Sequence, residues 1–159
     1  MPEPELGLVA DRAGRLVAVT VGNDLSSRSI EGENPLYLPQ AKVYNGSCAV
    51  GPALVPLTDG AALRALVIEL YIRRDGEVLF SDSVPLSAMR REPDELLDWL
   101  YRALDFPVGV VLLTGTSIVP PPELTLRADD VVDIVVPGVG TLTNPVVEVG
   151  RKATNSAFA

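Results

Sequence analysis

The segment from Leu66 to Phe80 constrains the fold most strongly, because apolar residues recur in it at every second position. They stand at positions 66, 68, 70 and 72, and a period of two places them on one face of an extended strand. Asp75-Gly76 then indicates a tight turn, and Val78-Leu79-Phe80 resumes the β-forming sequence. We therefore expect a β-hairpin here, in a chain that is mainly β.

Similar short apolar runs, separated by turn-forming residues, predict further strands. The expected strands cover residues 6–10, 16–22, 66–72, 78–80, 108–113, 131–136 and 146–149. One helix is expected from Pro93, followed by two acidic residues and by leucines at helical spacing up to Leu104. A shorter helical turn is expected through 61–66, and the leucines of the main helix are expected to be core.

The stretch from Ser26 to Tyr44 fits neither a helix nor a strand, because it is long, polar and interrupted by Pro35 and Pro39. A segment of this length in a compact domain is usually functional or disordered. Its apolar residues favour an ordered functional loop. The dipeptides Gly51-Pro52 and Asn144-Pro145 indicate turns.

The length of 159 residues suits one domain with one core. We expect residues 1–150 to form it and residues 151–159 to be a frayed tail. The first residues carry no basic start and no apolar run, and no apolar stretch is long enough to span a bilayer. Together with a single unpaired Cys48, this favours a soluble cytoplasmic protein.

The types of residue present limit the possible chemistry. The chain has no histidine and one cysteine, so it cannot itself form a Ser-His-Asp triad, a His-ligated zinc site or an internal disulfide. Its 13 basic and 21 acidic residues give a charge of −8, which argues against nucleic-acid and anionic-membrane partners. Carboxylates, hydroxyls, lysine and arginine remain, and these favour a hard metal ion.

Three carboxylates are candidates for such a site. Glu3 and Glu5 project from the same face of an extended strand. If residues 3–10 and 15–22 pair as a hairpin, Glu3 lies opposite about Gly22, and Asp24 follows just beyond. Like charges held together favour a bound cation such as Mg²⁺. Alternatively, the two glutamates form a solvated N-terminal face and Asp24 caps a turn.

Six short segments, in this order, are similar to the fumarylacetoacetate hydrolase superfamily over nearly the whole chain. They are Glu3-Pro-Glu5, Val21-Gly-Asn-Asp24-Leu-Ser-Ser-Arg28, Gln40-Ala-Lys42, Gly51-Pro52, Thr114-Gly-Thr116 and Gly138-Val-Gly-Thr-Leu142-Thr-Asn144. The resemblance implies a mainly β fold with one or two helices, the mixed β-sandwich roll of the family's catalytic domain. It also implies a Mg²⁺ or Mn²⁺ site formed by Glu3, Glu5 and Asp24, and a homodimer or higher homo-oligomer.

Three positions depart from the family's common pattern without removing an expected metal ligand: Ser29, Asn45 and Asp129-Asp130. Family members usually carry a further segment before the Glu-x-Glu motif. Residues 1–150 are therefore expected to be the catalytic domain alone.

The loop Gly32–Lys42 is most similar to the sugar-acid branch of the superfamily, which includes 2-keto-3-deoxy-D-arabinonate dehydratases. This implies a Mg²⁺-dependent lyase that dehydrates a small 2-keto-3-deoxy sugar acid through a metal-stabilised enolate. Lys42 is the candidate catalytic base or stabilising cation, and it also contacts substrate. Arg28, Gln40 and Thr141 are the other candidate substrate contacts. The alternatives are a surface Lys42, an Arg28 paired with a nearby glutamate, and a strand-end hydroxyl at Thr141.

Two other functions stay open at this point. One is an acylpyruvate or diketone C–C hydrolase, or a decarboxylase, of the same superfamily. The histidine of its hydrolytic members lies upstream of the matched region, so the absence of histidine here does not separate it from a dehydratase. The other is a truncated, non-catalytic metal-binding domain.

Overall fold

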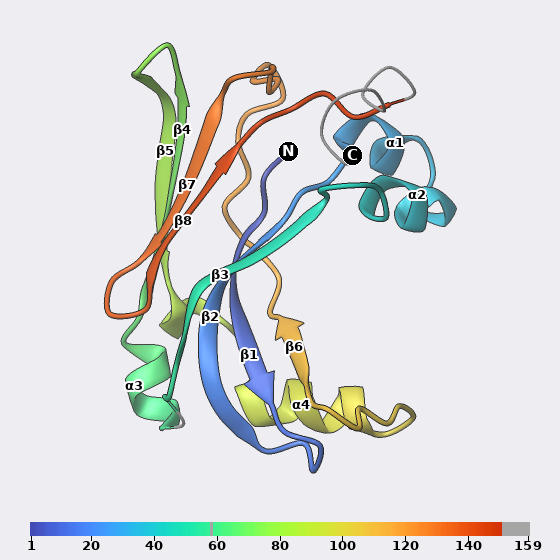
Figure 1. Ribbon diagram of the computed structural model, residues 1–159, viewed down its shortest axis with the longest axis vertical. Helices are drawn as coiled ribbons and strands as arrows, with labels where there is room; N and C mark the ends of the chain where they lie inside the picture. Colours follow the sequence, from blue (N-terminus) through green and yellow to red (C-terminus); the bar gives the residue numbers. More distant parts are fainter. Residues whose placement is uncertain (58, 151–159) are drawn as a thin grey trace, which may run out of the picture.

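Two four-stranded antiparallel sheets make up the computed structural model, which describes residues 1–57 and 59–150 (Figure 1). One sheet has the order β3-β2-β1-β6 and the other the order β5-β4-β7-β8. The strands are β1 Pro4–Ala10, β2 Leu16–Asp24, β3 Cys48–Val55, β4 Val67–Arg74, β5 Glu77–Pro85, β6 Val110–Leu113, β7 Val131–Val136 and β8 Gly140–Pro145. The helices are α1 Arg28–Glu33, α2 Leu38–Lys42, α3 Gly60–Arg64 and α4 Pro93–Tyr101, with 3-10 turns η1 Pro35–Tyr37 and η2 Leu86–Ala88. The expected mainly β fold class is confirmed.

The hydrophobic core includes residues from strands of both sheets. Leu6 and Leu8 of β1 and Leu70 of β4 are fully buried, as alternation along each strand requires. Helix α4 adds Leu97 to the core. The expectation that all leucines of this helix are core is wrong for Leu104, which follows the end of α4 and is largely exposed.

The hairpin of β1 and β2 forms as expected, but in a different register. Glu5, rather than Glu3, lies opposite Gly22. The turn is longer than predicted, because the Asp11 carboxylate accepts hydrogen bonds from the backbone of Ala13 and Arg15. The register then shifts again between Val9 and Ala10. As a result, each residue near the end of β2 lies opposite the β1 residue two positions later than predicted.

Two strands at sheet edges were not expected. Gly51-Pro52 lies within β3 and Asn144-Pro145 lies at the end of β8, so neither forms the predicted turn. Both strands are at an edge of their sheet, where proline is tolerated because one side of the strand needs no N–H donor. The strand expected at 146–149 does not form, and β6 begins at residue 110 rather than 108.

The segment expected to be a loop, residues 26–44, contains α1, η1 and α2. Its prolines begin helices instead of interrupting them. Pro35 opens η1 and Pro39 lies in the first turn of α2, where a missing N–H costs nothing. The helices lie beside the end of the first sheet at which β2 finishes (Figure 1).

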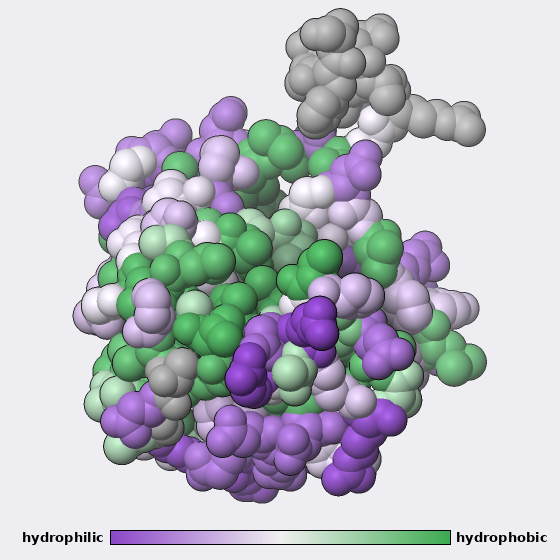
Figure 2. All heavy atoms as spheres, turned by 60° about the horizontal axis from the view of Figure 1, so that its bottom comes forward, coloured by the Kyte–Doolittle hydropathy of each residue, from purple (hydrophilic) through white to green (hydrophobic). Residues whose placement is uncertain are grey.

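The outer surface carries exposed hydrophobic side chains. Seen with the lower side of Figure 1 turned forward, they gather in a broad patch bordered by hydrophilic residues (Figure 2). No helix within the described ranges is long and apolar enough to cross a membrane. The expected tail, 151–159, lies outside the described residues.

Candidate metal centre

Three carboxylates meet where β1 begins and β2 ends. Glu3 and Glu5 lie on one face because they are two residues apart. Asp24 joins them because its backbone N–H donates to the Glu3 carbonyl oxygen at 3.1 Å. One oxygen from each of the three carboxylates lies within 4.8 Å of the others. The altered register therefore brings Asp24 opposite Glu3 rather than beyond the end of the hairpin.

Glu5 is the buried member of this group, with 3% of its surface exposed. Its carboxylate accepts a hydrogen bond from the backbone N–H of Gly115, in the loop after β6. Burial, the largest cause, and the charges of Asp24 and Glu3 raise the pKa of Glu5 to about 7, against the lowering effect of the Gly115 N–H and of Lys42. Without a metal ion, ionisation of Glu5 is therefore disfavoured.

Lys42, the last residue of α2, places its ammonium against two of the carboxylates. Its Nζ lies 2.7 Å from Glu3 Oε2 and 2.8 Å from Asp24 Oδ2. Burial lowers the pKa of Lys42, but the hydrogen bonds and charges of Asp24 and Glu3 outweigh it, so the pKa is raised overall. Lys42 is thus a cation in this arrangement.

The donor set fits a divalent metal ion. All three side chains offer carboxylate oxygens, which Mg²⁺ and Mn²⁺ prefer. Three ionised carboxylates outnumber the single ammonium by two charges. The carboxylate of Glu5 is bonded to a neutral N–H and to no ammonium or guanidinium among the described residues. A divalent cation would balance this excess.

The structure does not bring the other predicted site residues to the carboxylates. The Arg28 guanidinium contacts Met1 Sδ and donates to the Pro120 carbonyl oxygen at 2.8 Å, beside a separate cavity of about 390 Å³. Within the described ranges, Arg28 forms no ion pair with the glutamates of α1. Gln40 is exposed on α2, and Thr141 is exposed on β8.

Three residues that contact this group were not singled out from the sequence. Ser26 donates its hydroxyl to the Glu3 carboxylate. Gly115 donates its N–H to Glu5, and Asn23 accepts the backbone N–H of Glu3 at 3.2 Å. All three lie in the motifs that carry the family resemblance, but no pattern in the sequence assigns them a contact.

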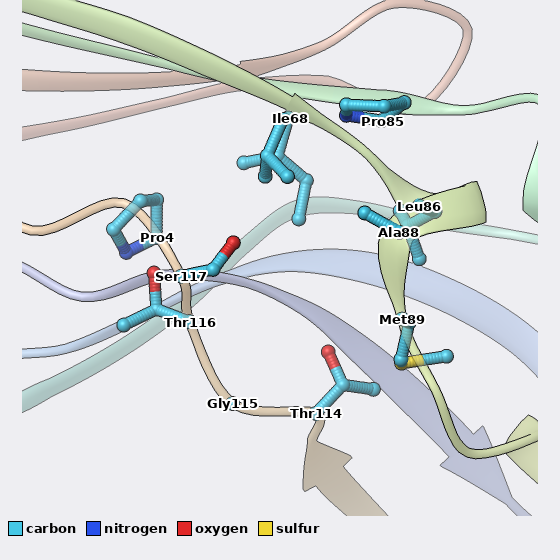
Figure 3. Close-up of a pocket in the computed structure, with 11 residues that line it drawn as sticks. Pro4, Ile68, Pro85, Leu86, Ala88, Met89, Thr114, Gly115, Thr116 and Ser117 are labelled. Atoms are coloured by element: carbon cyan, nitrogen blue, oxygen red, sulfur yellow. The ribbon is translucent and has the colours of Figure 1, made fainter.

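A second cavity, of about 210 Å³, adjoins the loop that contains Gly115 (Figure 3). Pro4, Thr114 and Ser117 lie around it, opposite the apolar side chains of Ile68 and Met89. Because Pro4 alternates with Glu3 and Glu5 along the strand, the cavity lies on the other face of β1. The Gly115 backbone borders the cavity and also contacts Glu5.

Comparison with known proteins identifies the family. The fumarylacetoacetate hydrolase C-terminal family matches residues 5–147. The chain belongs to this family. Among curated fumarylacetoacetate hydrolase relatives, the "Probable 2-keto-3-deoxyxylonate dehydratase" of Haloferax volcanii is 50% identical over 149 residues, covering 94% of this chain and 51% of the relative. The "2-dehydro-3-deoxy-D-arabinonate dehydratase" of Saccharolobus solfataricus is 43% identical, covering 92% and 49%.

A solved structure agrees with this assignment to the fumarylacetoacetate hydrolase family. A 2-keto-3-deoxy-D-arabinonate dehydratase complexed with magnesium and 2,5-dioxopentanoate superposes with a TM-score of 0.86 at 42% identity, covering 91% of this chain and 52% of that one. The expected family and its branch are thus confirmed. The chain spans about half the length of the curated relatives that it matches.

Proposed function

We propose that this chain is the catalytic domain of a lyase that removes water from a 2-keto-3-deoxy sugar acid with the help of Mg²⁺, or of Mn²⁺ in its place. The observation that carries the proposal is the convergence of Glu3, Glu5 and Asp24, with Lys42 across two of them. The names of the relatives and the magnesium in the related complex support the same reaction.

Glu3, Glu5 and Asp24 would hold the metal ion. When bound, a divalent cation supplies positive charge that makes the C3 proton of a 2-keto acid more acidic. The three carboxylates fix the position of that charge, and the Gly115 N–H and the Ser26 hydroxyl orient two of them. Dehydration then requires removal of the C3 proton and departure of the C4 hydroxyl.

Lys42 acts beside the metal ligands as a cation. Its raised pKa keeps the ammonium protonated while it pairs with Glu3 and Asp24. In this state it stabilises negative charge on the substrate and does not remove a proton. Base action by Lys42 would require these two contacts to be lost first, because they are what raise its pKa.

We propose that Arg28, Gln40 and Thr141 contact the substrate. Arg28 suits a carboxylate because its guanidinium offers parallel N–H donors. To bind one, it would exchange its contacts with Met1 and Pro120. Gln40 and Thr141 offer exposed polar groups on α2 and β8.

The proposal includes a homo-oligomeric, cytoplasmic enzyme with no nucleic-acid or membrane partner. The hydrophobic patch in Figure 2 supports self-association, since exposed apolar patches often mark protein interfaces. Light scattering coupled to size-exclusion chromatography tests the oligomeric state. A monomer at micromolar concentration would contradict it.

The deciding experiment gives the protein two substrates in the presence of Mg²⁺. We expect 2-keto-3-deoxy-D-arabinonate to lose water and yield 2,5-dioxopentanoate, and an acylpyruvate to remain intact. We also expect chelation of the metal or the substitution Asp24→Asn to abolish turnover. The exposed Glu77 on β5 provides a matched control, because Glu77→Gln removes one carboxylate far from the site.

Two results would contradict the proposed function. Turnover of the acylpyruvate without turnover of the sugar acid would indicate a C–C hydrolase of the same family. A folded chain that binds no Mg²⁺ in calorimetry would indicate a non-catalytic domain.

A further inference from the structure

We infer that Asn23 and Asn144 are positioning residues, which hold the strand segment carrying Glu3 in place for metal binding. The inference rests on the proposed metal site. It states that the side chains of Asn23 and Asn144, which lie behind the carboxylates, help to set the position of Glu3. Asn23 directly precedes Asp24 in β2, and Asn144 lies in β8 of the other sheet. Neither side chain is a proposed metal ligand.

The first step of the argument is the direction of the Asn23 side chain. Successive side chains of a strand point to opposite faces, so Asn23 points away from the face that carries Asp24. Its side chain is directed towards the second sheet, and 4% of its surface is exposed. A carboxamide buried to this extent must find hydrogen-bond partners within the protein.

The second step is the set of partners that Asn23 finds. Its Oδ1 accepts the backbone N–H of Glu3 at 3.2 Å, and its Nδ2 donates to Asn144 Oδ1 at 3.0 Å. One planar amide therefore links β1, β2 and β8. The two bonds are mutually dependent, because an Oδ1 turned towards Glu3 leaves only Nδ2 to face Asn144.

The third step is that few backbone hydrogen bonds hold Glu3, whose side chain is bonded separately to Ser26 and Lys42. Pro2 and Pro4 flank it, and proline has no N–H to donate. Glu3 thus carries the one backbone donor of the three-residue stretch, and that donor goes to Asn23. The carbonyl of Glu3 accepts from Asp24. Without Asn23, the metal-ligand residue would keep one of these two backbone bonds.

A role in positioning differs from a general structural role, and β8 itself offers the control. Thr143 adjoins Asn144 in β8 but points to the opposite face, where its hydroxyl donates to Asp133 Oδ1 at 2.6 Å. Thr143→Ala therefore removes one side-chain hydrogen bond from the same strand without affecting Asn23. It should lower stability and leave the metal site unchanged.

Calorimetric titration with Mg²⁺ tests the inference on the wild type, Asn23→Ala, Asn144→Ala, the double variant and Thr143→Ala. We expect Asn23→Ala to weaken Mg²⁺ binding about tenfold, the usual scale for residues that orient metal ligands. Asn144→Ala should weaken it by a smaller factor. The double variant should bind as Asn23→Ala does, because Asn144 acts only through Asn23.

Hydrogen exchange of the Glu3 amide, measured without metal, provides a second readout. We expect exchange to be about tenfold faster in Asn23→Ala, faster by a smaller factor in Asn144→Ala, and unchanged in Thr143→Ala, because only Asn23 accepts the Glu3 N–H directly. Unchanged exchange, or wild-type Mg²⁺ affinity in Asn23→Ala, would overturn the inference. If the wild type binds no Mg²⁺, the proposed function fails, whereas the exchange rates still decide whether Asn23 holds Glu3.

Discussion

At the scale of single residues, Glu5 shows how the candidate site differs from an ordinary acidic surface. Its carboxylate is buried and is paired with the Gly115 N–H rather than with a cation. The Lys42 ammonium instead pairs with the other two carboxylates, those of Glu3 and Asp24. Burial is consequently the largest of the influences that together raise the pKa of Glu5 to about 7. This makes the metal-free protein sensitive to pH near neutrality.

Glu5→Gln should remove that sensitivity. The folded protein holds a proton on Glu5 up to about pH 7, whereas an unfolded glutamate loses it near pH 4.5. A raised pKa contributes stability that is complete below the unfolded pKa and is lost as the pH rises through the folded value. We therefore expect the wild type, relative to Glu5→Gln, to lose about 3 kcal/mol of unfolding free energy between pH 4.5 and pH 8.

Urea denaturation in the presence of a chelator measures this difference, because comparing the two proteins cancels the other titrating groups. The prediction fails if wild type and Glu5→Gln change in parallel with pH. Mg²⁺ affinity offers an independent check, since proton and metal compete for the same carboxylate. It should rise with pH through neutrality in the wild type and be greatly reduced in Glu5→Gln.

The sequence was sufficient to predict those residues of the site whose positions follow from simple periodicity. Glu3 and Glu5 share a face because they are two residues apart, and the turn between β1 and β2 brings Asp24 near them. Asn23 and Ser26 could not be identified in this way. Their contacts depend on β8 and on side-chain rotation, neither of which leaves a periodic pattern in the sequence.

At the scale of elements, two ion pairs, one at each sheet, differ in burial. Arg74 at the end of β4 binds Asp130, just before β7, with Nε at 2.7 Å and Nη2 at 2.8 Å from its two oxygens. Asp130 is 1% exposed, and the Arg74 guanidinium holds its pKa below the usual range. The pair Arg15–Asp11 in the β1–β2 turn has an arginine side chain that is 79% exposed.

This contrast predicts unequal effects of the same substitution. Arg74→Met leaves a buried carboxylate without its cation, and we expect a clear loss of unfolding free energy. Arg15→Met removes an exposed pair, and its loss should be much smaller. Urea denaturation at pH 7 measures both. Equal losses would show that Asp130 is not compensated mainly by Arg74.

Strand prediction succeeded where apolar residues mark a buried face and failed for two of the edge strands, β3 and β8. The hairpin of β4 and β5 was expected because apolar residues recur at every second position of β4. The edge strand β3 has no comparable pattern, since most of its residues are exposed or only partly buried, and Pro52 interrupts it. The short helices of residues 28–42 were missed for a related reason, because their prolines occupy first turns and their residues are mostly exposed.

At the scale of the whole molecule, the candidate metal site joins parts of the chain that only folding brings together. Glu3 directly precedes β1 and Glu5 lies in it, Asp24 ends β2, and Lys42 reaches Glu3 and Asp24 from α2. An unfolded chain has no such group, so a bound cation stabilises the folded state selectively. The charge of −8 adds a weaker, general response to salt, which screening by any salt would produce.

We therefore expect Mg²⁺ to raise the melting temperature beyond the effect of an equal ionic strength of NaCl. At about 100 times the dissociation constant, binding contributes about 2.7 kcal/mol, which corresponds to a rise of about 5 to 10 °C for a chain of this size. Asp24→Asn should abolish this rise. A rise that NaCl reproduces would contradict a specific site.

Lys42→Met sharpens the same test, because the ammonium and the metal ion compensate the same carboxylates. Without Lys42, none of the three carboxylates pairs with a cation from the described part of the chain in the metal-free protein, so its melting temperature should fall. Mg²⁺ then binds a more negative group, and the rise that it produces should be larger than in the wild type. Scanning calorimetry with and without Mg²⁺ measures both changes. If the rise is instead as small as in Asp24→Asn, Lys42 supports metal binding rather than competing with it. The ammonium would then not compensate Glu3 and Asp24 in the way that its two ion pairs indicate.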